Sequence, residues 1–280
     1  RSDGVPEFTC ALIVPTEGDV PLCGGIGPNS EEPEEAGIQP FGLAVRQSTT
    51  ARPGHVFASS FDGTFSVYRL DPGADTRLAA QTLVGAGAYG LAIHPTTSEA
   101  YITTKNSDRL FAVTVDDTGT DVAFQTRVVN IPNSTNGSDF GRGIAFNDSG
   151  TLAFIAYRTP ASLLVMDTSV GTDGRAANIV IDNVPLATGP ASVAVANSAP
   201  GGGELVYVTL FDSDEVAVID PRRLEVVALI PTGDGPFDIT IVQQAGVARA
   251  YVTLFEEGAI GVIDIDPTSV FYHQEIARIP

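Results

Sequence analysis

The stretch VYVTLFDSDEVAVIDPRRLEVVALIPTGDGPFDITI, residues 206–241, contains three short apolar segments, a glycine-rich corner and the first segment of another unit. The same order returns in AYVTLFEEGAIGVIDIDPTSVFYHQEIARIP, residues 250–280. Both copies place Tyr-Val-Thr-Leu-Phe ahead of Val-Ile-Asp, and both reach Ile-Pro. The segments are rich in β-branched and aromatic residues and are separated by Asp, Gly, Ser and Pro, a pattern typical of strands and turns. The repeat therefore predicts an all-β fold.

The opening strand of this unit occurs five times along the chain. Its second residue is small or short each time and lies at positions 42, 90, 143, 192 and 238, so the units are 48, 53, 49 and 46 residues apart. Each unit contains four predicted strands, which indicates a β-propeller of four-stranded antiparallel blades. We predict five blades, at about residues 38–87, 88–140, 141–188, 189–234 and 235–280. The sequence leaves open whether a complete ring has five, six or seven blades.

The repeat resembles that of the YVTN family of β-propellers, in which a Tyr-Val-Thr strand precedes a Val-Ile-Asp strand. Residues 207–209 with 218–220, and 251–253 with 262–264, carry the match, and residues 101–103 are a weaker copy. The resemblance covers about residues 38–280 and implies the propeller fold. It also implies a possible relation to lactonase-like enzymes, because such repeats occur in them. Propellers support many unrelated functions, so the resemblance does not select one.

The net charge of the chain limits the classes of molecule that it can bind. Fifteen basic residues against 34 acidic ones give a net charge of −19. A surface of this sign repels a phosphate backbone, so we expect no nucleic-acid binding. The charge has two interpretations: solubility in an external medium, or attraction for cations or for a basic protein partner. A protein partner is expected in either case. No apolar run reaches the roughly 20 residues that cross a bilayer, so membrane insertion is not expected either.

Residues 1–37 differ in composition from the repeats. They hold eight acidic residues against one arginine and are rich in Pro and Gly, so we predict an acidic amino-terminal segment of loop character. Its two cysteines, Cys10 and Cys23, are the only ones in the chain. We favour a local disulfide between them over a pair of free thiols. A disulfide is typical of proteins outside the reducing cytosol, so we expect an extracytoplasmic location, in the periplasm, at the cell surface or secreted.

One turn has the composition of a weak calcium site. Residues 116–121 read Asp-Asp-Thr-Gly-Thr-Asp, and the carboxylates of Asp116, Asp117 and Asp121 are hard oxygen ligands of the kind that calcium prefers. Turns of Asp and Gly between outer strands are common without any metal. Calcium is therefore one interpretation and a simple turn is the other. No other cofactor is indicated.

Three polar residues are candidates for the central channel. His94 follows an inner strand, whereas Arg142 and Asp238 lie at the mouth of inner strands. A hydrolytic site would need a base oriented by a partner, and no such spacing is present. We therefore favour a non-catalytic, extracytoplasmic module for protein interaction or surface assembly. The alternatives are a lactonase-like enzyme that uses the channel mouth, and a docking module for a basic redox partner such as a cytochrome.

Overall fold

The computed structural model describes residues 39–46, 54–70, 77–117, 122–131, 141–244 and 246–280. In these ranges the regular structure is β-strand throughout, which confirms the predicted all-β class. None of these residues forms a helix long and apolar enough to span a membrane. The predicted acidic segment, residues 1–37, and the predicted Cys10–Cys23 disulfide lie outside the described residues.

In the described ranges twenty strands form five sheets of four, one for each predicted repeat. The first two blades contain β1 (Pro40–Arg46), β2 (Gly54–Ser60), β3 (Thr64–Leu70), β4 (Arg77–Leu83), and then β5 (Ala88–Ile93), β6 (Ala100–Thr104), β7 (Arg109–Asp116), β8 (Ala123–Asn130). The third contains β9 (Gly141–Phe146), β10 (Leu152–Tyr157), β11 (Ser162–Asp167), β12 (Ile179–Pro185). The last two contain β13 (Pro190–Ala196), β14 (Leu205–Leu210), β15 (Glu215–Asp220), β16 (Glu225–Pro231), and then β17 (Pro236–Gln244), β18 (Val247–Leu254), β19 (Ala259–Asp264), β20 (Gln274–Ile279).

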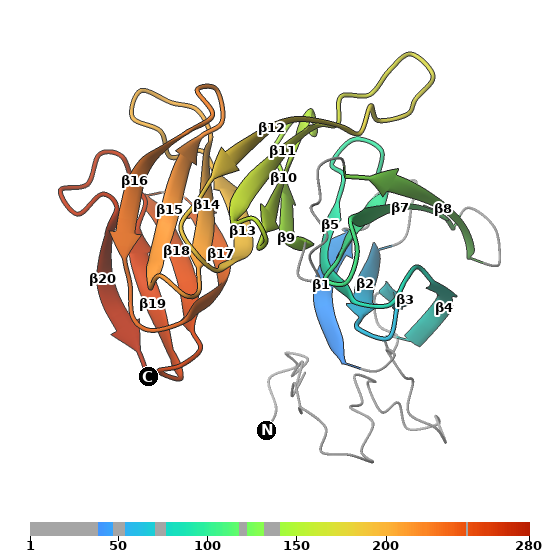
Figure 1. Ribbon diagram of the computed structural model, residues 1–280, viewed down its shortest axis with the longest axis horizontal. Coiled ribbons are helices and arrows are strands. Elements are labelled where there is room, and N and C mark those ends of the chain that lie inside the picture. The colour runs from blue at the N-terminus through green and yellow to red at the C-terminus, as the bar shows by residue number, and fades with distance from the viewer. Residues whose placement is uncertain (1–38, 47–53, 71–76, 118–121, 132–140, 245) are drawn as a thin grey trace, which may run out of the picture.

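Within each blade the strands pair antiparallel in chain order, from the inner strand outward. The inner strands β1, β5, β9, β13 and β17 pack side by side in this order, each against the one before it from β5 onward. Figure 1 shows the resulting arc, which runs from strands β1–β4, coloured blue to teal, to strands β17–β20, coloured orange to red. The predicted β-propeller of four-stranded blades is therefore confirmed, with five blades in the described residues.

The core lies between the blades. Side chains alternate across each strand, so a blade has two apolar faces and each must be covered by a neighbour. The junction of the fourth and fifth blades is one example, where Tyr207 and Val218 pack with Ile239 and Val252, all of them buried. Each such side chain contributes about 1.5–3 kcal/mol on burial. Stacking of the blades is therefore what stabilises the repeat.

The inner strands approach closely at their second residue, which explains why that residue is small or short. A Cβ atom added at Gly90 would lie 2.2 Å from the carbonyl oxygen of Arg142 in the next blade. Hydroxyl groups on the second strands join the blades beside this position: Ser59 Oγ donates to the Tyr89 carbonyl at 2.9 Å, and Thr209 Oγ1 to the Phe237 carbonyl at 3.0 Å. Thr103 Oγ1 donates to the Arg142 carbonyl in the same way. These bonds fix where the inner strands begin.

Candidate functional site

The two ends of the inner strands define two faces of the propeller. We call the face at which the inner strands begin the front face, and the face at which they end the back face. Because the pairing is antiparallel, the second strands end at the front face; Ala88, for example, pairs with Thr104, and Pro236 with Leu254. The residues that follow the second strands therefore lie beside those that begin the inner strands. This places aromatic side chains from both segments together.

The first aromatic group lies on the first two blades at the front face. Phe41 stacks on Tyr89 with ring centres 4.7 Å apart, and Phe61 lies 6.0 Å from Phe41. Two cations cover these rings: the guanidinium of Arg142 is 5.0 Å from the centre of Tyr89, and Lys105 Nζ is 5.9 Å from that of Phe61. We call these five residues the cationic aromatic group. Lys105 is the single lysine of the chain, and it forms no ion pair within the described ranges.

The second aromatic group lies on the fourth and fifth blades of the same face. Phe211, Phe237 and Phe255 form a triangle with ring centres 5.8–6.3 Å apart. Phe255 is 70% exposed, although a phenylalanine gains free energy when it is buried. The guanidinium of Arg158 lies 5.9 Å from the Phe211 ring and is paired with Asp212 at 2.8 Å.

Carboxylates surround this second triangle. Asp234, Glu256 and Glu257 are exposed on the turns that flank Phe237 and Phe255. Glu257 accepts a hydrogen bond from the backbone N–H of Asp234 at 2.9 Å and pairs with Arg278 at 2.7 Å, so its position is fixed. We call Phe211, Phe237, Phe255, Asp234, Glu256 and Glu257 the acidic aromatic group. Apolar side chains at the centre with charged ones around them are the usual anatomy of a protein interface.

The three predicted channel residues do not come together. Arg142 and Asp238 are at the front face, where Asp238 accepts a hydrogen bond from Ser192 Oγ at 2.7 Å. His94 follows the end of β5 at the back face, five residues beyond Tyr89, which is about 17 Å along a strand. The inner strands all run in the same direction, so the end of one strand and the start of the next lie at opposite faces.

His94 has a clear packing role. It is 1% exposed, and its ring lies 5.0 Å from that of Phe146 in the next blade. The backbone N–H groups of Thr96 and Thr97 donate to Nδ1 at 3.1 and 3.2 Å, and Nε2 lies 3.1 Å from the Thr168 carbonyl. This set of partners fits a neutral ring that carries its proton on Nε2. His94 therefore joins the second blade to the third.

The predicted calcium ligands also lie at the back face. Asp116 ends β7, Asp117 follows it, and Asp121 is outside the described residues. The Asp117 carboxylate contacts the Arg46 guanidinium, and the same guanidinium donates to His55 Nδ1 at 2.8 Å. All three side chains are buried. A calcium ion at Asp117 would have to displace this guanidinium, and among the described residues no group of three or more His, Cys, Asp or Glu side chains is arranged to hold a metal ion. The calcium site stays a prediction.

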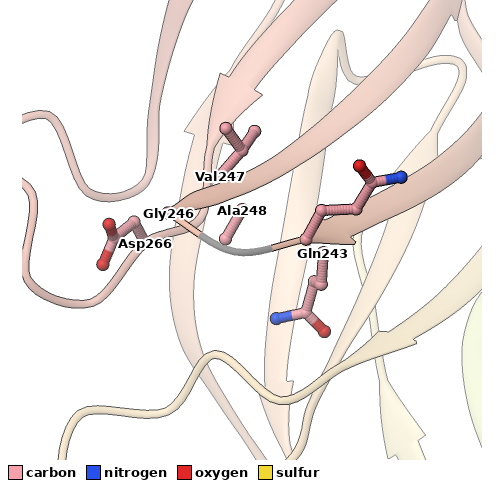
Figure 2. Close-up of a pocket in the computed structure, with 6 residues that line it drawn as sticks. Gln243, Gly246, Val247, Ala248 and Asp266 are labelled. Carbon is pink, nitrogen blue, oxygen red and sulfur yellow. The ribbon is translucent and has the colours of Figure 1, made fainter.

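A shallow hollow of about 400 Å³ opens at the back face of the last blade. It is lined by Gln243, Gln244, Gly246, Val247, Ala248 and Asp266, and Figure 2 shows five of these labelled around the turn between β17 and β18. Gln243 exchanges two hydrogen bonds of 3.1 Å with the backbone of Asn197, so it holds the fifth blade to the fourth. The hollow lies at the opposite end of the blade from the acidic aromatic group. It offers no convergent set of polar groups for a small ligand.

The acidic aromatic group was not predicted from the sequence. Phe211 and Phe255 are the last residues of the two Tyr-Val-Thr-Leu-Phe copies, whose pattern predicts a strand through the phenylalanine. The usable signal is the run of turn-forming and acidic residues that directly follows each phenylalanine, residues 212–214 and 256–258. The strands end just before these runs, at Leu210 and Leu254, so each phenylalanine lies at the turn.

The fold is similar to that of many solved structures. No family model matches the chain, and no curated protein matches it, so the resemblance to the YVTN family stays a prediction. A protein of unknown function from Desulfotomaculum acetoxidans is 14% identical with a TM-score of 0.64, over 86% of this chain and 70% of that one. A "putative 6-phosphogluconolactonase" from Bacteroides uniformis is 17% identical with a TM-score of 0.60, over 79% of this chain and 65% of that one.

A third similar structure is a complex of nidogen and laminin, which is 15% identical with a TM-score of 0.55, over 86% of this chain and 79% of that one. At these identities the similarities establish the fold and no activity. The chain spans just under two thirds of the length of the Bacteroides protein. The comparisons therefore agree on a β-propeller.

Proposed function

We propose that this propeller is a non-catalytic protein-interaction module, located outside the cytoplasm, that binds a basic protein through the acidic aromatic group. One observation carries the proposal: Phe255 is 70% exposed beside Phe211 and Phe237, with Asp234, Glu256 and Glu257 around them. Covering an exposed phenylalanine contributes about 1.5–3 kcal/mol. The partner is therefore expected to place an apolar side chain over the triangle.

Charge selects the sign of the partner. The carboxylates around the triangle favour Lys and Arg, and the net charge of −19 steers a basic protein toward the whole chain. The carboxylates of Asp212 and Glu257 are already paired with Arg158 and Arg278, so Asp234 and Glu256 are the groups expected to meet partner cations. Exposed charges of this kind act mainly on the rate of association and on its salt dependence.

A solution measurement with a defined probe tests the proposal. The probe is a basic c-type cytochrome, and binding is followed by interferometry at about 0.15 M salt, where long-range attraction is screened. Phe255→Ser is expected to weaken binding at least about tenfold, as for a residue at the centre of an interface. Val270→Ser is the matched control, because Val270 is 85% exposed on a distant turn and is expected to have no effect. Equal affinity of Phe255→Ser and the unaltered protein would overturn the proposal.

The same measurement separates a general basic partner from a redox partner. A basic protein without a redox group is compared with the cytochrome under identical conditions. Similar affinities for the two proteins support a module that recognises the charge and shape of its partner. Tight binding of the cytochrome alone, lost in Phe255→Ser, would favour docking of a redox protein as the finer function.

A lactonase-like enzyme is the second candidate. It is favoured by the position of Arg142 and Asp238 at the front face, where the inner strands begin. The distance of His94 from these two residues leaves the set without a base, which supports the binding role over the enzymatic one. Hydrolysis of sugar lactones by the purified chain, abolished in Asp238→Asn with unchanged thermal stability, would reverse this order.

A further inference from the structure

Consecutive blades meet through the same set of positions each time. One blade presents a trailing face, which includes one position on its second strand that is a hydroxyl in the first, second and fourth blades and Ala156 in the third. The next blade presents a leading face, which includes the third residue of its inner-strand motif. At that third position Ile144, Val193 and Ile239 are each 6% exposed, and Leu91 is partly buried. The contact is therefore a property of the repeat and does not depend on one blade.

The leading face of the first blade is exposed at the corresponding positions. Leu43 holds the position of Ile144 and Val193, and it is 66% exposed. Val45, two residues along the same side of β1, is 50% exposed. Exposed apolar side chains in this register are the ones that a preceding blade would bury.

The trailing face of the last blade is also exposed. Thr253 holds the position of Thr209, which is buried and donates to the next blade, but Thr253 is exposed. Its pairing neighbours Ile260 and Ile279 are 38% and 47% exposed. Their counterparts in the fourth blade, Val216 and Ile230, are 0% and 1% exposed.

These two faces border one opening in the arc. The inner strands of consecutive blades pack together along the arc, and among the described residues β17 and β1 show no comparable packing. Figure 1 shows β17–β20 and β1–β4 at the two ends of the arc, with the opening between them. An occupant of the opening must match a trailing face on one side and a leading face on the other. A blade of this repeat has one face of each kind.

We propose that the opening is an interface for further blades of the same repeat, carried by the same polypeptide as the five described here. Such a blade would accept the Thr253 hydroxyl at its first inner-strand carbonyl, as Phe237 accepts that of Thr209. On its other side it would cover Leu43 and Val45. A second copy of the chain fits less well, because its two matching faces are separated by five blades. Residues 1–37 are predicted to have loop character, whereas a blade needs four strands.

The test extends the chain at its carboxyl end by one blade, a second copy of residues 235–280, or by two blades, a second copy of residues 189–280. At least one extended chain is expected to unfold about 5 °C or more above the original and to lose most of its binding of an apolar fluorescent dye. Leu43→Glu is then made in both forms. It is expected to leave the original unchanged, because Leu43 is exposed there, and to remove the gain in the extended chain.

Leu83→Glu is the matched control, since Leu83 is 76% exposed on the outer strand β4 and is expected to change neither form. Three results would overturn the proposal. One is that neither extension raises the melting temperature or lowers dye binding. Another is that the original chain is a stable dimer by light scattering, with Leu43→Glu making it monomeric. The third is that deletion of residues 1–37 increases dye binding, and that Leu43→Glu lowers the melting temperature of the original chain from which nothing has been deleted. These two results together would assign the leading face of the first blade to residues 1–37.

Discussion

The two aromatic groups of the front face are built at equivalent places in different blades, yet the exposed carboxylates Asp234 and Glu256 border only the second one. In the cationic aromatic group, Arg142 is 4% exposed and lies against Tyr89 under the beginning of the next blade. In the acidic aromatic group, Phe255 is 70% exposed and its neighbours are carboxylates. The first group uses its charge inside the fold, and the second presents its charge to solvent. Equivalent positions of a repeat can therefore serve stability in one blade and recognition in another.

The largest expected difference between the groups is in stability. Arg142→Ala removes a buried guanidinium from the Tyr89 ring and leaves a void, so we expect a loss of about 3 kcal/mol in the free energy of unfolding. Arg158→Ala makes the corresponding change at Phe211, where the guanidinium is partly exposed, and a loss below about 1 kcal/mol is expected. Urea unfolding of both variants measures the difference. Equal losses would mean that the two cations have the same role.

A smaller difference is expected when the charges of the groups are neutralised. The double variant Asp234→Asn, Glu256→Gln removes two exposed carboxylates without disturbing Glu257, which holds the turn. Its affinity for a basic protein is expected to fall about fivefold, with a weaker dependence on salt. Lys105→Gln is the counterpart in the cationic aromatic group, and a change of less than about twofold is expected. An equal response in both variants would indicate attraction by the net charge alone.

The smallest effect concerns pH and the junction between the fourth and fifth blades at the back face. His273 lies against Tyr272, its Nε2 is 3.0 Å from Tyr207 Oη, and its backbone N–H donates to the Asp264 carbonyl. Burial lowers the pKa of His273 to about 4 from its usual 6.5. The unfolded chain therefore takes up this proton near pH 6.5 and the folded chain only near pH 4. Stability is fully present above pH 6.5 and declines as the pH falls from 6.5 toward 4.

His273→Asn tests this junction, because asparagine tolerates the positive φ of 60° at this position and does not titrate. Between pH 7 and pH 5 the melting temperature of the unaltered chain is expected to fall about 3 °C further than that of the variant. Lys105→Gln, in the cationic aromatic group, is the control and is expected to show the same pH dependence as the unaltered chain. Identical pH profiles for His273→Asn and the unaltered chain would exclude His273 as the source.

The sequence predicted the fold well because its signal is local and repeated. The small residue at Gly42, Gly90, Gly143, Ser192 and Asp238 marks each inner strand, and in the structure each of these residues lies in one. The candidate site is different, since Phe211, Phe237 and Phe255 come from three segments whose proximity depends on the pairing of strands in two blades. His94 shows the same limit. Its polar character suggested the channel, but its position after β5 places it at the back face.

The proposed binding face on the fourth and fifth blades depends on an exposed phenylalanine in acidic surroundings. The most direct measurement is the affinity of a basic c-type cytochrome for the unaltered chain, Phe255→Ser and Phe41→Ser at about 0.15 M salt. Phe41 is 49% exposed in the cationic aromatic group, so it controls for the loss of an exposed phenylalanine at the same face. The account predicts binding at least about tenfold weaker for Phe255→Ser and unchanged for Phe41→Ser. Equal affinities for all three proteins, or a loss confined to Phe41→Ser, would contradict it.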